Sequence, residues 1–103
     1  MPVVVIETAP VGVPIEAVDA VFRSLGVESD PPPGMIFHVT VDRAGRAQHI
    51  DVWETEDHYR RFERERVQPA VERVRASRGA PNTPQQPPEA EVLHVVNLAI
   101  GRG

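Results

Sequence analysis

The stretch HIDVW, residues 49–53, places three chemically active side chains at alternate positions. His49, Asp51 and Trp53 are separated by aliphatic residues, and alternate residues of a β-strand point to the same face of a sheet. An imidazole, a carboxylate and an indole would therefore share one face. Such a face can move protons and hold a planar ligand, so it is the first candidate for a functional site.

An alternating stretch at residues 35–41 and the turn-forming sequence DRAGR precede this strand. Together they predict a β-hairpin with its turn at residues 43–46. Side chains that face each other across such a hairpin lie about 5 Å apart at Cβ, which is close enough for a hydrogen bond. The predicted polar face consists of three cross-strand pairs: His38 with Asp51, Thr40 with His49, and Ile36 with Trp53.

The pair of His38 and Asp51 predicts acid–base chemistry. A carboxylate on one imidazole nitrogen fixes the tautomer and leaves the other nitrogen to take a proton from a substrate. We therefore predict His38 as a general base, Asp51 as the group that orients it, and Trp53 as an aromatic wall for a planar ligand. Two other interpretations use the same residues. The pair can be an ordinary cross-strand contact, or it can join His49 in a two-His, one-carboxylate metal site.

The elements that must position this hairpin follow a β-α-β-β-α-β order. Residues 3–8 form a β-branched run, residues 15–25 carry apolar side chains at helical spacing, and residues 92–100 form a last apolar run. A second helix is predicted after Thr55, with apolar side chains on its buried side from Tyr59 to Val74. Pro69 lies inside it and predicts a kink or break there. We predict a ferredoxin-like α+β fold, with a four-stranded antiparallel sheet and both helices on one face, in a single domain over residues 1–103.

One face of the predicted sheet is left without a cover. The helices lie on one side only, yet the other side carries aliphatic and aromatic residues such as Phe37, Val39 and Ile50. A domain of this size buries only about two thirds of its unfolded surface, so a partner subunit would help it considerably. We therefore expect a homodimer in which two such sheets pack face to face.

The composition excludes several classes of chemistry. The chain has no cysteine, and all 11 of its Lys and Arg residues are arginine; this rules out disulfides, thiolate nucleophiles, zinc–thiolate sites and Schiff bases. No glycine-rich phosphate loop or dinucleotide motif is present, so no organic cofactor is expected. A net charge of -4 without a basic block argues against nucleic acid or an anionic membrane as partner. No signal peptide or membrane span is recognisable, and we expect a cytoplasmic protein with a bacterial, high-GC composition.

Three segments, DVWETEDHYRRF, VQPAV and VLHVVNLAI, resemble the dimeric α/β-barrel superfamily, and within it the antibiotic-biosynthesis-monooxygenase-like group. The resemblance implies homodimers with a ligand cavity between sheet and helices. It also implies activities such as cofactor-free oxygenation of polyphenolic polyketides, polyketide cyclisation or haem degradation. Trp53 corresponds to the tryptophan of the oxygenase-like motif, and Asn97 to a cavity amide. The haem-degrading type needs a mid-helix histidine, whereas His58 is in the first turn, so haem is not expected.

We therefore predict a homodimer whose cavity takes a small apolar, aromatic or polyketide-like compound of secondary metabolism. As an enzyme it would remove an acidic proton from a phenol or from a carbon beside a carbonyl. Aldol closure would then make it a cyclase, and capture of the carbanion by O2 a cofactor-free monooxygenase. A non-catalytic ligand-binding or accessory dimer is the competing interpretation. His94 and Asn97 point to opposite faces of a strand, so only one of them can line the cavity, and the sequence does not choose between them. The Pro-rich residues 77–89 are predicted as a surface connector, with a lid or dimer strap as the alternative.

Overall fold

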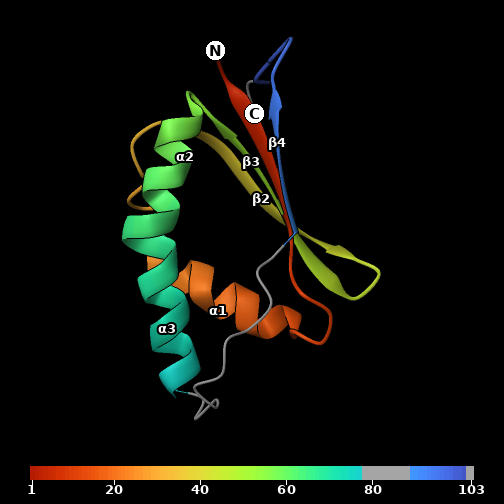
Figure 1. Ribbon diagram of the computed structural model, residues 1–103, viewed down its shortest axis with the longest axis vertical. Helices are drawn as coiled ribbons and strands as arrows, with labels where there is room; N and C mark the ends of the chain where they lie inside the picture. Colours follow the sequence, from red (N-terminus) through yellow and green to blue (C-terminus); the bar gives the residue numbers. More distant parts are fainter. Residues whose placement is uncertain (78–88, 102–103) are drawn as a thin grey trace.

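A computed structural model describes residues 1–77 and 89–101 of the chain. Its four strands form one antiparallel sheet in the order β2-β3-β1-β4, with the helices gathered on one side (Figure 1). The predicted ferredoxin-like order is thereby confirmed. The strands are β1 (Val3–Thr8), β2 (Met35–Arg43), β3 (Arg46–Trp53) and β4 (Glu89–His94), and the helical segments are α1 (Ile15–Leu25), α2 (Glu56–Phe62), the π-helical η1 (Glu63–Val67) and α3 (Gln68–Ser77).

The hairpin of β2 and β3 has the predicted register over most of its length. His38 pairs with Asp51, and Thr40 pairs with His49. A β-bulge between Met35 and Phe37 shifts the register at the start of β2, so Met35 and not Ile36 pairs with Trp53. The prediction for Ile36 is wrong because a bulge inserts one extra residue on one strand, which the alternating pattern does not reveal.

Turn chemistry explains why the register is right elsewhere. The two central residues of the turn, Ala44 and Gly45, have positive φ angles of 52° and 87°, as in the tight turns whose twist matches that of the strands. The backbone N–H of Gly45 also donates to the Asp42 carboxylate at 2.8 Å. The turn therefore starts the pairing at Arg43 with Arg46.

The second helical region begins at a capped end and contains a π-helical turn near its middle. The hydroxyl of Thr55 accepts a hydrogen bond from the backbone N–H of His58 at 3.2 Å, which satisfies a donor of the first turn. Pro69 has no N–H to give to the carbonyl four residues earlier, and the turn before it is π-helical, with the N–H of Gln68 bonded to the carbonyl of Glu63. The chain does not break into two helices at Pro69; the irregularity is a π-helical turn just before the proline, through which the backbone stays helical.

The apolar core lies between the sheet and the helices. Val3, Val5 and Trp53 contribute its most deeply buried side chains from β1 and β3. The helices add the rest of the buried cluster: Val21, Leu25, Tyr59, Phe62, Val67 and Ala70. Within the two described ranges, no helix has the length and apolar character needed to cross a bilayer.

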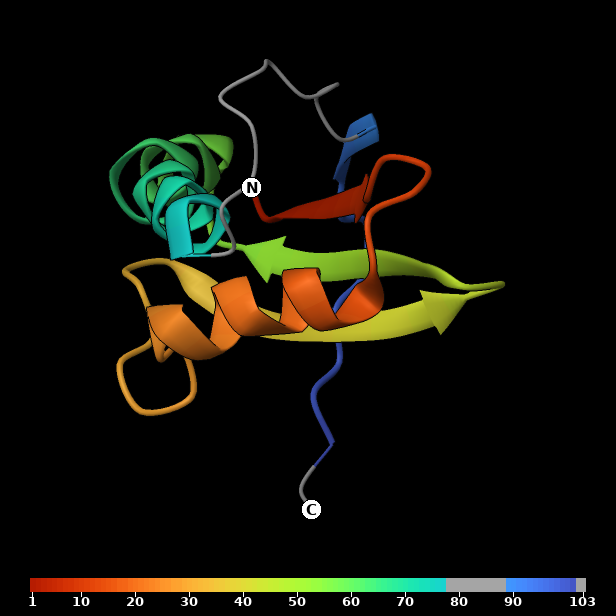
Figure 2. The same cartoon turned by 90° about the horizontal axis from the view of Figure 1, so that it is seen from below.

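Apolar side chains are exposed to solvent on the opposite face of the sheet and in the C-terminal segment. Phe37 on β2 is 48% exposed, and Val96 and Ile100 beyond β4 are 99% and 71% exposed. The predicted strand at residues 92–100 is only partly correct, because β4 ends at His94. The last backbone bond to β1 joins the N–H of Val95 to the carbonyl of Pro2, and β1 offers no further partner. Figure 2 shows the segment after β4 leaving the sheet; residues 78–88 of the predicted connector lie outside the described residues.

Candidate functional site

The predicted pair of His38 and Asp51 forms on the face of the sheet that the helices cover. Nδ1 of His38 lies 2.5 Å from Oδ1 of Asp51, and the two side chains are 15% and 6% exposed. With an ionised Asp51, Nδ1 is the donor of this hydrogen bond. The imidazole is therefore held in one tautomer, and its Nε2 is the nitrogen that can exchange a proton with a ligand.

Thr40 connects this pair to the second histidine. Its hydroxyl oxygen lies 2.9 Å from Nδ1 of His49 and 3.4 Å from Nε2 of His38. The pKa of His49 is lowered to about 4, mainly by burial; the charge of Asp51 opposes this shift and that of His38 adds to it. His49 is therefore neutral at physiological pH.

Phe22 of α1 covers both imidazoles, and it is not among the predicted site residues. Its ring is stacked on His38 at 4.6 Å between centroids, with 14° between the planes, and lies 4.2 Å from the centroid of His49. The helical spacing of apolar residues placed Phe22 on the buried side of its helix. That spacing did not show which strands the helix crosses, so the contact with the histidines was not predicted.

A second set of ionisable groups lies in the same interior. Glu7 of β1 is buried, pairs across the sheet with His49, and accepts a 2.6 Å hydrogen bond from the hydroxyl of Tyr59. Burial, followed by the charge of Glu7 and a hydrogen bond to it, raises the pKa of Glu63 to about 8. Burial and the bond to Glu7 also raise the pKa of Tyr59. In the sequence, the signal for this set is Glu7, the single charged residue of β1, which alternates with the core residues Val3 and Val5.

Trp53 lies deep in the core. Its side chain is fully buried, with the ring centroids of Phe62 and Tyr59 at 5.1 Å and 6.2 Å. Its indole N–H has no hydrogen-bond partner among the residues the structure describes. The role of Trp53 as a wall for a ligand stays a prediction, since in this structure Phe22 is the aromatic ring in contact with the histidines.

The remaining predicted residues lie around or outside this cluster. Asn97 is exposed and follows β4. His94 pairs with Val3, so it is on the helix-covered face, and it too is exposed. Over residues 1–77 and 89–101, no group of three His, Asp or Glu side chains is placed to hold a metal ion. The structure therefore does not support the metal interpretation of His38, His49 and Asp51.

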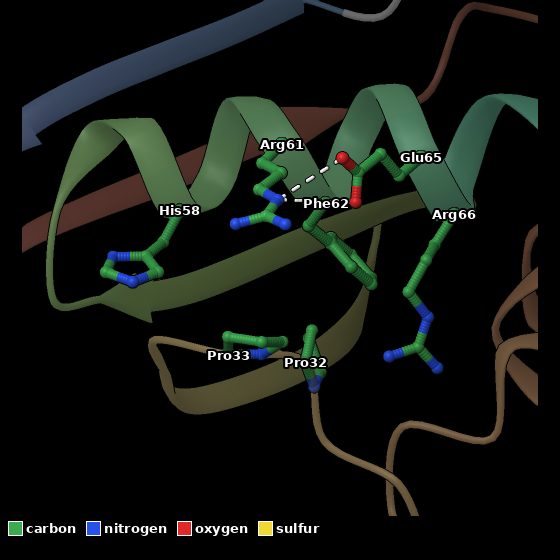
Figure 3. Close-up of a pocket in the computed structure, with 7 residues that line it drawn as sticks. All are labelled: Pro32, Pro33, His58, Arg61, Phe62, Glu65 and Arg66. Carbon is green, nitrogen blue, oxygen red and sulfur yellow. Dashed lines mark hydrogen bonds and ion pairs between the residues drawn. The ribbon is translucent and has the colours of Figure 1, made fainter.

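A small pocket lies apart from these residues, between a proline segment and α2–η1 (Figure 3). Arg66 fixes one side of it by donating to the carbonyls of Leu25 and Asp30 at 2.6 Å and 3.2 Å. With a volume of about 70 Å³, it is far smaller than the cavities that enclose metabolites. Its lining consists of Pro32, Pro33, His58, Arg61, Phe62, Glu65 and Arg66.

The sheet order and the helices on one face define a ferredoxin-like α+β protein with the fold of antibiotic-biosynthesis-monooxygenase-like proteins, so the predicted resemblance is confirmed for the fold. One similar solved structure is Rv0793 from Mycobacterium tuberculosis, with 17% identity and a TM-score of 0.65 over 97% of this chain and 100% of that chain. Another is SnoaB, a cofactor-independent oxygenase from Streptomyces nogalater, with 18% identity and a TM-score of 0.58 over 98% of each chain.

A third is the monooxygenase from the gene ActVA-Orf6 of Streptomyces coelicolor in complex with nanaomycin D. It has 20% identity and a TM-score of 0.57 over 97% of this chain and 92% of that chain. No protein-family profile and no curated protein sequence matches the chain. At these identities the likeness establishes the fold alone.

Proposed function

We propose that this chain is a small-molecule enzyme that uses acid–base chemistry, without an organic cofactor, on an aromatic or polyketide-like metabolite. The observation that carries the proposal is the His38–Asp51 pair, shielded on the helix-covered face and stacked under Phe22. The fold supports the same class of reaction, because a cofactor-independent oxygenase and a monooxygenase in complex with nanaomycin D share it.

His38 would act as the general base through Nε2. The proton moves from a phenol O–H, or from a C–H beside a carbonyl, to this nitrogen, and the electron pair stays on the substrate as a phenolate or enolate. Asp51, 2.5 Å from the other nitrogen, stabilises the imidazolium that forms. The hydroxyl of Thr40 is the present neighbour of Nε2 at 3.4 Å, and a substrate hydroxyl would take its place.

Two fates of the anion fit this first step. Attack of the carbanion on a carbonyl of the same molecule forms a C–C bond, and the new alkoxide takes the proton back from His38, which is a cyclase reaction. At a carbon that keeps a second hydrogen, reaction of the carbanion with O2 forms a C–O bond and a peroxide anion, which takes the proton from His38. Loss of water then leaves a carbonyl: one oxygen atom stays in the product, the other leaves as water, and the substrate carbon supplies the electrons. This is a cofactor-free monooxygenase reaction. His49 supports either fate as a neutral hydrogen-bonding group, because burial lowers its pKa to about 4.

Replacement of the base tests this assignment. His38→Gln should lower turnover of phenolic or β-keto substrates by about 10²- to 10⁴-fold, the usual contribution of a positioned general base. Asp51→Asn should lower it as well, because the amide cannot stabilise the imidazolium. His58→Gln is the matched control, since His58 lies at the start of α2 and bonds to Thr55. An undiminished rate in His38→Gln would sink the assignment.

A ligand-binding protein without catalysis is the second candidate, and one observation favours it. The polar side chains of the site already satisfy one another, through the contacts of Asp51 with His38 and of Thr40 with His49. Tight binding of a phenol with no chemical change over hours, in the presence of O2, would favour this role over that of an enzyme.

We further propose that the protein acts as a homodimer. The support is the apolar surface left in water, which includes Phe37 and Leu93 on the sheet and Val96 beyond it. Phe37→Glu should shift the mass measured by light scattering from two chains to one. Val11→Glu, at an exposed loop position, should leave that mass unchanged; a monomeric unmodified protein at micromolar concentration would contradict the proposal.

A further inference from the structure

One phenyl ring closes the approach to the proposed base from the helix side. The ring of Phe22 is nearly parallel to that of His38, with 4.6 Å between centroids. The centroids of His38 and His49 are 5.7 Å apart, and Phe22 contacts both rings. The ring therefore covers the flat surface on which a planar ligand would stack, and it helps to keep His38 at 15% exposure.

The attachment of α1 allows this ring to move. Phe22 itself is only half-buried, whereas Val21 and Leu25 are the buried anchors of the helix. The C-terminal end of α1 is held by Arg66, which donates to the carbonyl of Leu25 at 2.6 Å. The N-terminal end has no side-chain cap, because Pro14 stands at that position. A rotation of the Phe22 side chain would uncover the imidazoles without moving the helix or breaking the sheet.

We propose that Phe22 is a displaceable cover over the His38–Asp51 pair, and that a planar phenol takes the place of its ring against the imidazole. The class of ligand rests on the proposed function, whereas the covering role rests on the ring contacts alone. The phenol replaces one stacked ring by another, so the stacking lost when Phe22 leaves is recovered.

The strength of a stacked aromatic contact sets the size of the effect. In addition to the effect of burying apolar surface, one stacked aromatic pair changes an equilibrium constant by about two- to tenfold. Removing the ring should therefore tighten binding of a planar phenol by about two- to tenfold. It should also expose the face of His38 to small reagents in the absence of any ligand.

Two measurements on the full chain test the cover. The first is the Kd of 1-naphthol, measured by calorimetry. The second is the rate at which diethyl pyrocarbonate modifies His38, relative to the exposed His94, mapped by mass spectrometry. Phe22→Ala should lower the Kd and raise the ratio of His38 to His94 modification, and Phe22→Leu should raise the ratio less. Val11→Ala is the control, because Val11 is an exposed loop residue outside the site and outside the proposed dimer face, and it should change neither quantity.

The outcomes separate the cover from the proposed function. An unchanged modification ratio in both Phe22 variants overturns the cover. Weaker binding of 1-naphthol to Phe22→Ala, with its fold intact by circular dichroism, also overturns it, because the ring would then be a platform and not a lid. A raised ratio with no binding of 1-naphthol to any protein confirms the shielding of His38, but it overturns the displacement by a phenol and with it the proposed class of ligand.

Discussion

Glu63 is predicted to destabilise the folded protein at neutral pH. Its carboxyl group faces Glu7 and Asp51 on the sheet and Arg60 on its own helix, and burial is the main cause that raises its pKa from 4.5 to about 8. Between pH 4.5 and about pH 8, Glu63 is protonated in more of the folded molecules than of the unfolded ones, so the folded chain binds more protons. Stability therefore falls as the pH rises through this range, and the loss is complete above pH 8.

The substitution Glu63→Gln removes this ionisation and keeps an amide that can donate to Glu7. A tenfold change in proton affinity corresponds to about 1.4 kcal/mol, which sets a ceiling of about 3 kcal/mol on the gain at pH 7. Water reaches part of the side chain and screens the effect, so we expect a gain of about 2 kcal/mol at pH 7. This corresponds to a rise in Tm of about 10 °C for a domain of this length.

Urea unfolding of both proteins between pH 4 and pH 9 measures the effect. The two stability curves should meet near pH 4, where Glu63 is protonated in both states, and diverge as the pH rises. Glu72→Gln is the matched control, because Glu72 is exposed on α3, and it should change stability by less than about 0.5 kcal/mol. A gain in Glu63→Gln that is as large at pH 4 as at pH 8 would refute the reasoning, because ionisation would then not be its cause.

Two further predictions concern the backbone at a glycine and the buried imidazole. Gly34 has a φ of 83°, and a Cβ there would collide with the ring of His58, whereas Gly45 has a φ of 87° and open space. Gly34→Ala should therefore cost about 2–4 kcal/mol and Gly45→Ala only about 1 kcal/mol in urea unfolding; equal costs would show that His58 simply moves away. The lowered pKa of His49, from 6.5 to about 4, means that stability falls as the pH drops through this range. NMR titration of His49 should show a midpoint near the lower value, and a midpoint near the higher one would contradict its burial.

The pair of His38 and Asp51 at the centre of the site could be predicted from the sequence, because the nearby turn determines which residues of the hairpin face each other. The turn at Ala44 and Gly45 starts the register, and every later pair up to His38 with Asp51 follows from it. The bulge beside Ile36 lies at the far end of the hairpin, where the strand meets a loop. The alternation of polar and apolar residues does not show where an extra residue is inserted. The predicted pairing of Ile36 with Trp53 is therefore wrong, whereas the pairs closer to the turn are right.

The rest of the site depends on contacts between distant parts of the chain. Phe22 contacts the histidines because α1 packs across the hairpin beside His38 and His49. The helical spacing of apolar residues does not show where a helix crosses a sheet. The end of β4 was predicted too late for a similar reason. An apolar run shows that a strand can continue, but pairing stops where β1 has no more backbone to offer.

The π-helical turn at Glu63–Val67 also determines how the two halves of this helical region are phased. One residue more than an α-helix would need is accommodated there, and each residue of an α-helix turns the chain by about 100°. The wider turn absorbs the extra residue locally, so α3 keeps its phase relative to α2 and Ala70 stays buried in the core. Deleting one residue from Glu63–Val67 should therefore restore a regular α-helix without turning Ala70 away from the core. An extra residue in a regular helix, without such a wide turn, would rotate all later residues by about 100°.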